Sequence, residues 1–229
     1  MIAERYTYLF VLFITIFFPF LFSFTKWFDF RTVWTPFFRM NIVIAAFFIV
    51  WDILFTKLGV WGFHHQFTIG LQICHLPIEE ILFFIFTPYS CLFTYYCLRK
   101  YIFPKMDVDY PFLWIFFALI LGCIAVWQFP KLYTFSAFVV CSIVLVGAYY
   151  FRLSFVHFII FYIIILFPFF ICNGILTGNF LNRVVVYYHP AQNMGMRWTT
   201  IPVEDIFYGM SLLLSHVICL EYVLRKRKP

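Results

Sequence analysis

Long runs of apolar residues, separated by short polar connections, dominate the chain. A run of roughly 17–25 apolar residues has the length that crosses a bilayer as a helix. Seven such runs cover residues 6–24, 40–56, 78–98, 111–129, 132–151, 153–176 and 203–224. The pattern predicts an all-α, polytopic membrane protein of about seven transmembrane helices.

Two of the connections are long. Residues 57–77 join the second and third helices, and residues 177–202 join the sixth and seventh. Both connections contain glycine, aromatic residues and histidine, and both carry little charge. Long loops in a compact bundle are usually functional or disordered. Their composition favours ordered loops that cover one end of the bundle.

The polar residues of the chain form an internal repeat. Pro77-Ile78-Glu79-Glu80 recurs as Pro202-Val203-Glu204-Asp205, 125 residues later, each time at the start of an apolar run. Gly70 and Gly195 precede the two prolines by seven residues, and Asp52-x-x-x-Thr56 matches Asn173-x-x-x-Thr177 at an offset of 121. The two motif sets are four helices apart, so both halves cross the membrane in the same direction. This arrangement is a parallel repeat about an axis along the membrane normal.

The repeat sets the expected domain organisation. Residues 1–106 form the first repeat, with three helices, and residues 107–229 contain a joining helix and the second repeat. The boundary lies in the polar linker Lys105-Met106-Asp107-Val108-Asp109.

Composition agrees with a membrane protein, because 65% of the residues are hydrophobic, only 11% are charged and the mean hydropathy is +0.95. Basic residues distinguish the two ends of the bundle. Those expected at one end are Arg5, Lys57, Lys131, Arg183 and Arg197. Those expected at the other are Lys26, Arg31, Arg39, Arg99, Lys100, Lys105, Arg152, Arg225, Lys226, Arg227 and Lys228. The positive-inside rule predicts an amino terminus outside and a cytoplasmic carboxyl terminus.

The chain lacks the usual signatures of cofactor binding. It contains neither a Gly-x-Gly-x-x-Gly nor a Gly-x-x-x-x-Gly-Lys motif, and its seven cysteines form no Cys-x-x-Cys pair. We expect no cofactor, no metal and no nucleic-acid partner, and the net charge of +6 reflects the positive-inside bias.

The repeated acids suggest chemistry. Five of the ten Asp and Glu residues fall in the motif set, at one depth of the bundle, and ionisable groups in membrane segments are functional candidates. Acids at a helix start also suit the helix dipole, but that effect explains a single acid better than a repeated pair. Burial and a like charge nearby both favour a neutral carboxyl group. A neutral acid beside an ionised one can act as an acid–base catalyst on an apolar substrate.

Aromatic residues make up 25% of the chain, and most of them must face lipid or pack. Those beside the motifs are the better candidates for the site: Trp51, Trp61, Phe83, Phe84, Tyr187, Tyr188, Trp198, Phe207 and Tyr208. Of these we select four aromatic candidates, Trp61, Phe83, Tyr187 and Tyr208. Aromatic faces stabilise cations in dry pockets.

These motifs resemble the integral-membrane lycopene cyclase domain family. The resemblance rests on Pro-Ile-Glu-Glu-Ile-Leu-Phe-Phe in the first half and on Ile-Pro-Val-Glu-Asp-Ile-Phe-Tyr-Gly in the second. Asn173-Gly-Ile-Leu-Thr-Gly178 and the stretch from Tyr187 to Gly195 add to it. The chain is similar to the fused form of a family whose heterodimeric bacterial members have separate domains, so a bacterial inner (plasma) membrane is the expected location.

The resemblance implies a carotenoid cyclase of isoprenoid metabolism, an isomerase of the intramolecular lyase type. It would cyclise the ψ-ends of lycopene to β-rings and yield γ- or β-carotene. The acids Glu79, Glu80, Glu204 and Asp205 are then the catalytic motifs, with Glu79 or Glu204 as our hypothesis for the proton donor. Supporting positions are Asp52, Asn173, Pro77, Pro202, Thr56 and Thr177, together with the four aromatic candidates.

Alternatives remain open at this stage. The substrate could be a fifty-carbon carotenoid, or only one end could be cyclised, or the acids could relay protons or cations in a transporter. The expected partners are an apolar carotenoid from the bilayer and membrane lipid, with carotenoid-pathway enzymes as further candidates. Oligomeric state is left open. A retinal protein would need a lysine within a helix, and all seven lysines lie at or beyond helix ends.

Overall fold

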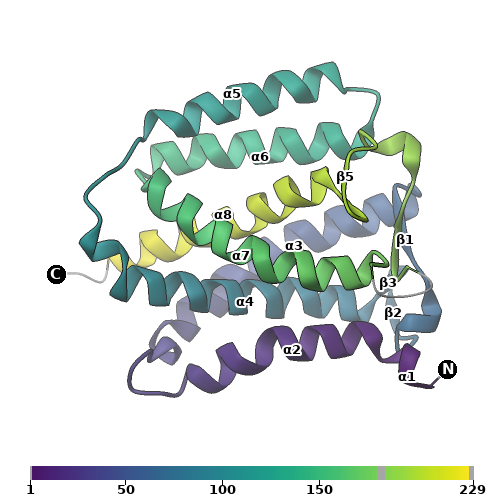
Figure 1. Cartoon of the computed structure of the whole chain (residues 1–229), viewed down its shortest axis with the longest axis horizontal. Coiled ribbons are helices and arrows are strands. Elements are labelled where there is room, and N and C mark those ends of the chain that lie inside the picture. Colours follow the sequence, from purple (N-terminus) through teal and green to yellow (C-terminus); the bar gives the residue numbers. More distant parts are fainter. Residues whose placement is uncertain (1, 180–183, 227–229) are drawn as a thin grey trace.

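The structure is a computed structural model, and it describes residues 2–179 and 184–226. Arg183, Arg227 and Lys228, three of the basic residues counted above, lie outside the described residues. Seven long helices run roughly alongside one another, and the strands gather at the end of the bundle that carries α1 (Ile2–Arg5) (Figure 1). The end of α8 lies at the opposite end of the bundle (Figure 1).

The first repeat contains α2 (Thr7–Phe22), α3 (Trp34–Lys57) and α4 (Ile78–Tyr101). A short 3-10 turn, η1 (Phe30–Val33), precedes α3, and η3 (Phe103–Lys105) follows α4. The second repeat contains α6 (Leu132–Tyr150), α7 (Phe155–Leu176) and α8 (Val203–Lys226). The joining helix α5 (Phe112–Trp127) packs on α6 at the edge of the bundle (Figure 1). The predicted all-α architecture with two parallel repeats is confirmed.

Of the seven long helices among the described residues, five have the length and apolar composition needed to cross a membrane. The other two, α2 and α5, are also apolar but have 16 residues each. Helix α3 starts at Trp34, six residues earlier than the apolar run indicated. The helix continues through Arg39, because this charged side chain is exposed on the helix surface and does not have to be buried in the bundle.

The described parts of the two long connections have the same arrangement. The first contains β1 (Trp61–Phe63), η2 (His65–Phe67), β2 (Gln72–Ile73) and β3 (Leu76–Pro77). The second contains β4 (Val186–Tyr188), η4 (Pro190–Gln192), β5 (Arg197–Trp198) and β6 (Ile201–Pro202). Strands β2 and β3 form a hairpin that leads into α4, and β5 and β6 form the matching hairpin before α8.

The two connections also pair with each other. Strand β1 runs antiparallel to β4, with Trp61 opposite Tyr188 and Gly62 opposite Tyr187. Gly62 and Tyr187 are 125 residues apart, which is the repeat offset. Equivalent residues of the two halves therefore face each other, so the pseudo-twofold axis passes through this strand pair.

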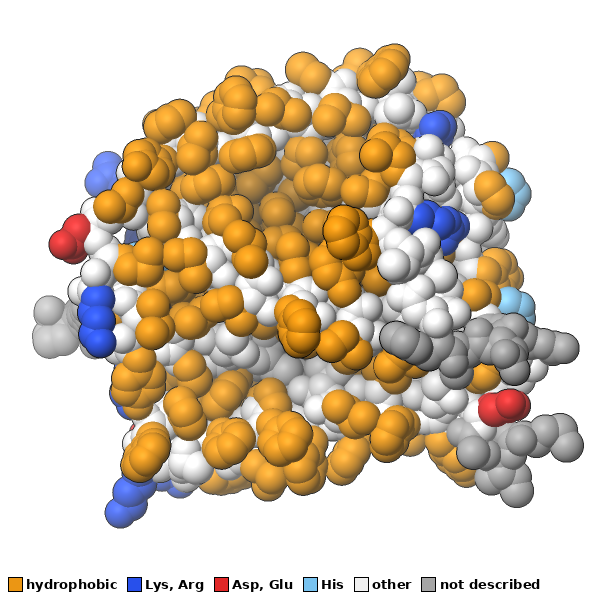
Figure 2. All heavy atoms as spheres, in the orientation of Figure 1, with side chains coloured by type: hydrophobic (Ala, Val, Ile, Leu, Met, Phe, Trp, Pro, Cys, Tyr) orange, Lys and Arg blue, Asp and Glu red, His pale blue; other side chains and the backbone are white. Residues whose placement is uncertain are grey.

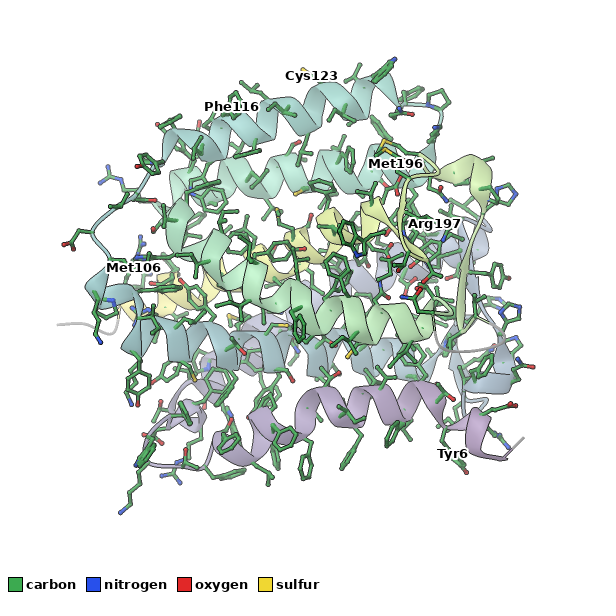
Figure 3. All side chains as sticks on the ribbon, viewed as in Figure 1. Tyr6, Met106, Phe116, Cys123, Met196 and Arg197 are labelled. Atoms are coloured by element: carbon green, nitrogen blue, oxygen red, sulfur yellow. The ribbon has the colours of Figure 1, made fainter. Side chains whose placement is uncertain are left out.

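Hydrophobic side chains cover the helices on the visible face of the molecule, whereas most of the visible Lys and Arg side chains lie at its left-hand end (Figure 2). Met106 lies at that end, and Met196 and Arg197 lie at the strand end (Figure 3). Such an apolar belt between polar ends is the surface that a bilayer requires.

Candidate active site

The four motif acids lie where the two hairpins run into their helices. Pro77 is the last residue of β3 and caps α4, and Pro202 is the last residue of β6 before α8. Both prolines are buried. Proline suits this position because it has no N–H to satisfy at a helix start. Each acid pair therefore occupies the first turn of a helix.

The first glutamate of each pair binds the backbone of its own hairpin connection. Glu79 Oε1 accepts a hydrogen bond from the Ile69 amide at 2.6 Å, and Glu204 Oε1 accepts one from the Met194 amide at 2.7 Å. Both glutamates are fully buried. Thr134 also donates to Glu204 Oε1, at 2.5 Å. These contacts hold the loops in place directly before Gly70 and Gly195, which have φ angles of +89° and +78°.

The second acid of each pair points the other way, into a cavity. Adjacent residues project about 100° apart on a helix, so one pair can serve two surroundings. Glu80 accepts a hydrogen bond from the Tyr8 hydroxyl through Oε2. Asp205 accepts one from the Tyr133 hydroxyl through Oδ1 at 2.5 Å. Tyr8 and Tyr133 are themselves 125 residues apart and were not identified from the sequence, although the repeat offset was a signal that could have found them.

The two halves differ in how many donors each acid receives. Asp205 Oδ2 also accepts hydrogen bonds from Asn173 Nδ2 at 2.8 Å and from the Tyr188 hydroxyl at 2.7 Å. Burial and the nearby Asp205 carboxyl raise the pKa of Tyr188, so this phenol stays protonated and donates. Tyr188 is one of the aromatic residues beside the motifs that the sequence indicated. Glu80 has only Tyr8 among the side-chain donors of the described residues.

Asp52, the counterpart of Asn173, is the third acid at this level. It is 2% exposed, and the Trp61 indole N–H donates to its Oδ1. Its Oδ2 is buried and has no hydrogen-bond partner among the described residues. A buried carboxylate oxygen without a donor is costly, so this environment favours the neutral acid. The asymmetric pair Asp52 and Asn173 thus gives the two halves different electrostatics.

The three acids line one cavity of about 360 Å³. Most of its wall comes from α2, α4, α7 and α8, and it is predominantly apolar. Aromatic rings surround the acidic end. The Trp61 and Tyr133 ring centroids are 5.0 Å apart, those of Tyr133 and Tyr188 are 5.9 Å apart, and Tyr208 lies 6.3 Å from Trp61. No group of three or more His, Cys, Asp or Glu side chains among the described residues could hold a metal ion.

The cavity reaches the lipid-facing surface between α2 and α7. Ile14 and Phe18 on α2 line it and are 48% and 59% exposed, and Pro168 on α7 lines it and is exposed too. These residues lie near the middle of their helices, at the depth of the hydrocarbon. Thr15 and Cys172 touch across the gap, with Oγ1 and Sγ 3.6 Å apart.

The remaining residues expected from the sequence fall in different places. Phe83, Trp61 and Tyr208 line the cavity. Thr177 does not line it, but bonds to the Asn173 carbonyl at 2.8 Å and to the Thr200 hydroxyl at 2.7 Å. The Thr56 hydroxyl is buried and has no partner among the described residues.

Tyr187 is a correction to the sequence analysis. It is 48% exposed, packs against His64 and does not line the cavity. Neighbouring residues of a strand point to opposite faces. The register of β4 on β1 turns Tyr188 toward the acids and Tyr187 away from them.

Replacing the first glutamates should separate their two possible roles. Glu79→Ala or Glu204→Ala leaves a loop amide without its acceptor and should lower the free energy of unfolding by about 1–3 kcal/mol. Glu79→Gln and Glu204→Gln keep an acceptor oxygen in the same place and should have little effect. Thermal unfolding in detergent measures both. Equal destabilisation by Gln and Ala would show that the charge, and not the acceptor, is required.

Comparisons with known proteins agree with this arrangement. The sequence model of the lycopene cyclase family matches residues 5–98 and again residues 130–223, so the matched regions begin 125 residues apart. A bifunctional lycopene cyclase/phytoene synthase from Pyrenophora tritici-repentis is 31% identical over 61 residues, which are 27% of this chain. The chain spans only about 10% of the length of that relative. No solved structure matches. The two regions that match the family model include all of α2, α3, α6 and α7, most of α4 and α8, and both hairpins. The chain belongs to the lycopene cyclase family.

Proposed function

We propose that the protein cyclises the ψ-ends of lycopene to β-rings by a proton-initiated, redox-neutral isomerisation. The observation that carries the proposal is the convergence of three carboxyl groups from both repeats on one apolar cavity that reaches the lipid-facing surface. Membership of the family and the partial match to a lycopene cyclase fusion support it. An apolar hydrocarbon from the bilayer suits the cavity wall.

The reaction needs one acid and one base. Protonation of the terminal double bond gives a tertiary cation, the next double bond attacks it to form the ring C–C bond, and loss of a proton leaves the new ring double bond. Glu80 is the acid, because it has one donor and lies near Asp52 and Asp205. Asp205 is the base, because three hydrogen-bond donors stabilise its ionised form.

This assignment revises our sequence-based hypothesis, which named Glu79 or Glu204 as the donor. Neither of them lines the cavity, and both bind loop amides. Return of the proton from Asp205 to Glu80 completes the cycle, so the chemistry consumes no electron carrier. The rings of Trp61, Tyr133 and Tyr208 face the same space and are placed to stabilise the cation, by about 2 kcal/mol or more for each ring in a dry site.

Pigment analysis of a lycopene-accumulating bacterium tests the function. Expression of the chain should convert lycopene to γ- or β-carotene. Glu80→Gln and Asp205→Asn should each reduce the conversion rate by about 10²-fold or more, because they remove the acid or the base.

Glu79→Gln is the matched control and should retain conversion, since Gln keeps the loop contact. Loss of conversion in Glu79→Gln with full activity in Glu80→Gln would reverse the assignment. If the wild-type protein is in the membrane and leaves lycopene unchanged, lycopene is not the substrate. A fifty-carbon carotenoid or proton transport would then be tested next.

We further propose that the substrate enters between α2 and α7. The variant Thr15→Cys places a thiol opposite Cys172, at a contact short enough for a disulfide. Oxidation should link the two helices and stop cyclisation, and reduction should restore it. The double variant Thr15→Cys/Cys172→Ser cannot form this disulfide, so oxidation should not change its rate of cyclisation. A fully cross-linked protein that remains active would exclude this entry route.

The outward orientation of the strand end is also a proposal, based on the charge distribution. Cys74 lies in the turn of the β2–β3 hairpin and is exposed. A membrane-impermeant maleimide should therefore label it in intact cells, and Cys74→Ser should lose the label. Labelling that requires permeabilised cells would place this end in the cytoplasm.

A further inference from the structure

A pseudo-twofold repeat that has a cavity on one side has an equivalent position on the other. The axis passes through the β1–β4 pair, where Gly62 faces Tyr187. The cavity lies against α2, α4, α7 and α8, so the equivalent position lies against α6, α8, α3 and α4. The residues at this equivalent position are found by adding 125 to the numbers of the cavity residues on α2 and α4 and by subtracting 121 from the numbers of those on α7.

Two of the counterparts on α3 are much larger than the cavity residues on α7. Trp51 stands where the cavity has Cys172, and Phe47 stands where it has Pro168. Phe48 is the counterpart of Phe169. A hydroxyl group is lost as well, because Thr15 of the cavity wall corresponds to Val140.

These aromatic side chains pack together. Trp51 is 7% exposed and Phe48 is 2% exposed. The Trp51 ring centroid lies 4.9 Å from that of Tyr208 and 5.7 Å from that of Phe48, and Phe48 lies 5.2 Å from Tyr208. The Trp51 indole nitrogen is buried and has no partner among the described residues. The side-chain volume of Trp51 therefore fills this position, and its indole nitrogen makes no hydrogen bond to a described residue there.

We propose that the chain has a single cyclisation pocket, to which both repeats contribute acids, and that Trp51 fills the pseudo-symmetric second pocket. The inference rests on the proposed function. One pocket takes one end of the carotenoid at a time. A two-ring product then requires the one-ring product to leave, reverse and bind again.

The binding stoichiometry tests this directly. Glu80→Gln keeps the pocket shape but lacks the acid, so it should bind lycopene without converting it. A polyene held in a chiral site shows circular dichroism in its visible band, whereas lycopene dissolved in lipid does not. Titration of the variant in lipid nanodiscs with lycopene should saturate this signal at one lycopene per chain. Saturation at two per chain would overturn the proposal.

A second variant places a tryptophan in the open cavity, at the position equivalent to Trp51. Cys172→Trp should abolish the induced signal and the cyclisation, while Cys123→Trp, which adds the same side chain on the exposed surface of α5 outside the cavity, should retain both. An unchanged signal in Cys172→Trp would overturn the proposal. Thermal unfolding shows whether Cys172→Trp is folded, and the stoichiometry of Glu80→Gln stands without it. If wild-type protein cyclises lycopene but two molecules bind, only this inference fails; if it neither binds nor cyclises lycopene, the proposed function fails with it.

Discussion

The structure depends on the need to supply hydrogen bonds to carboxyl groups inside an apolar bundle. A buried carboxyl oxygen without a donor costs several kcal/mol, and lipid offers no donors. The donors here are loop amides, phenol hydroxyls, an indole N–H, the Thr134 hydroxyl and the Asn173 side-chain amide. The hairpins before α4 and α8 are positioned by this requirement, because Glu79 and Glu204 each bind an amide ten residues upstream. The same interaction that pins the loop turns the neighbouring acid toward the cavity.

A symmetric scaffold has acquired an asymmetric site. Tyr8 and Tyr133 bind equivalent acids in the two halves, so the basic arrangement is shared. Asn173 and Tyr188 then add donors to Asp205 only, while Asp52 adds a third acid on the side of Glu80. A donor-rich carboxyl group beside a donor-poor one is the condition for separate acid and base roles. Divergence at a few positions is sufficient to produce it.

Much of this architecture could be predicted from the sequence, because apolar runs and a repeated motif report directly on helices and their symmetry. The site could be predicted only in part. The side chains of a Glu-Glu pair project from the helix about 100° apart. The sequence does not tell which of the two side chains faces the cavity, because that depends on how the helix packs. The choice between Tyr187 and Tyr188 depends on strand register across 125 residues, which no local pattern encodes. Tyr8 was within reach of the sequence, because its repeat partner is also a tyrosine.

The length of α2 has a consequence for the surrounding lipid. Sixteen helical residues span about 24 Å, whereas the hydrocarbon core of a bilayer is about 30 Å thick. An apolar segment shorter than the hydrocarbon core is accommodated by thinning of the adjacent bilayer, by flanking side chains that reach toward the interface, or by oligomerisation, at a modest energetic cost. Because α2 forms one side of the cavity mouth, thinning at this helix would compress the lipid tails next to that mouth. A long, stiff hydrocarbon would leave such a thinned region more easily than an undisturbed bilayer.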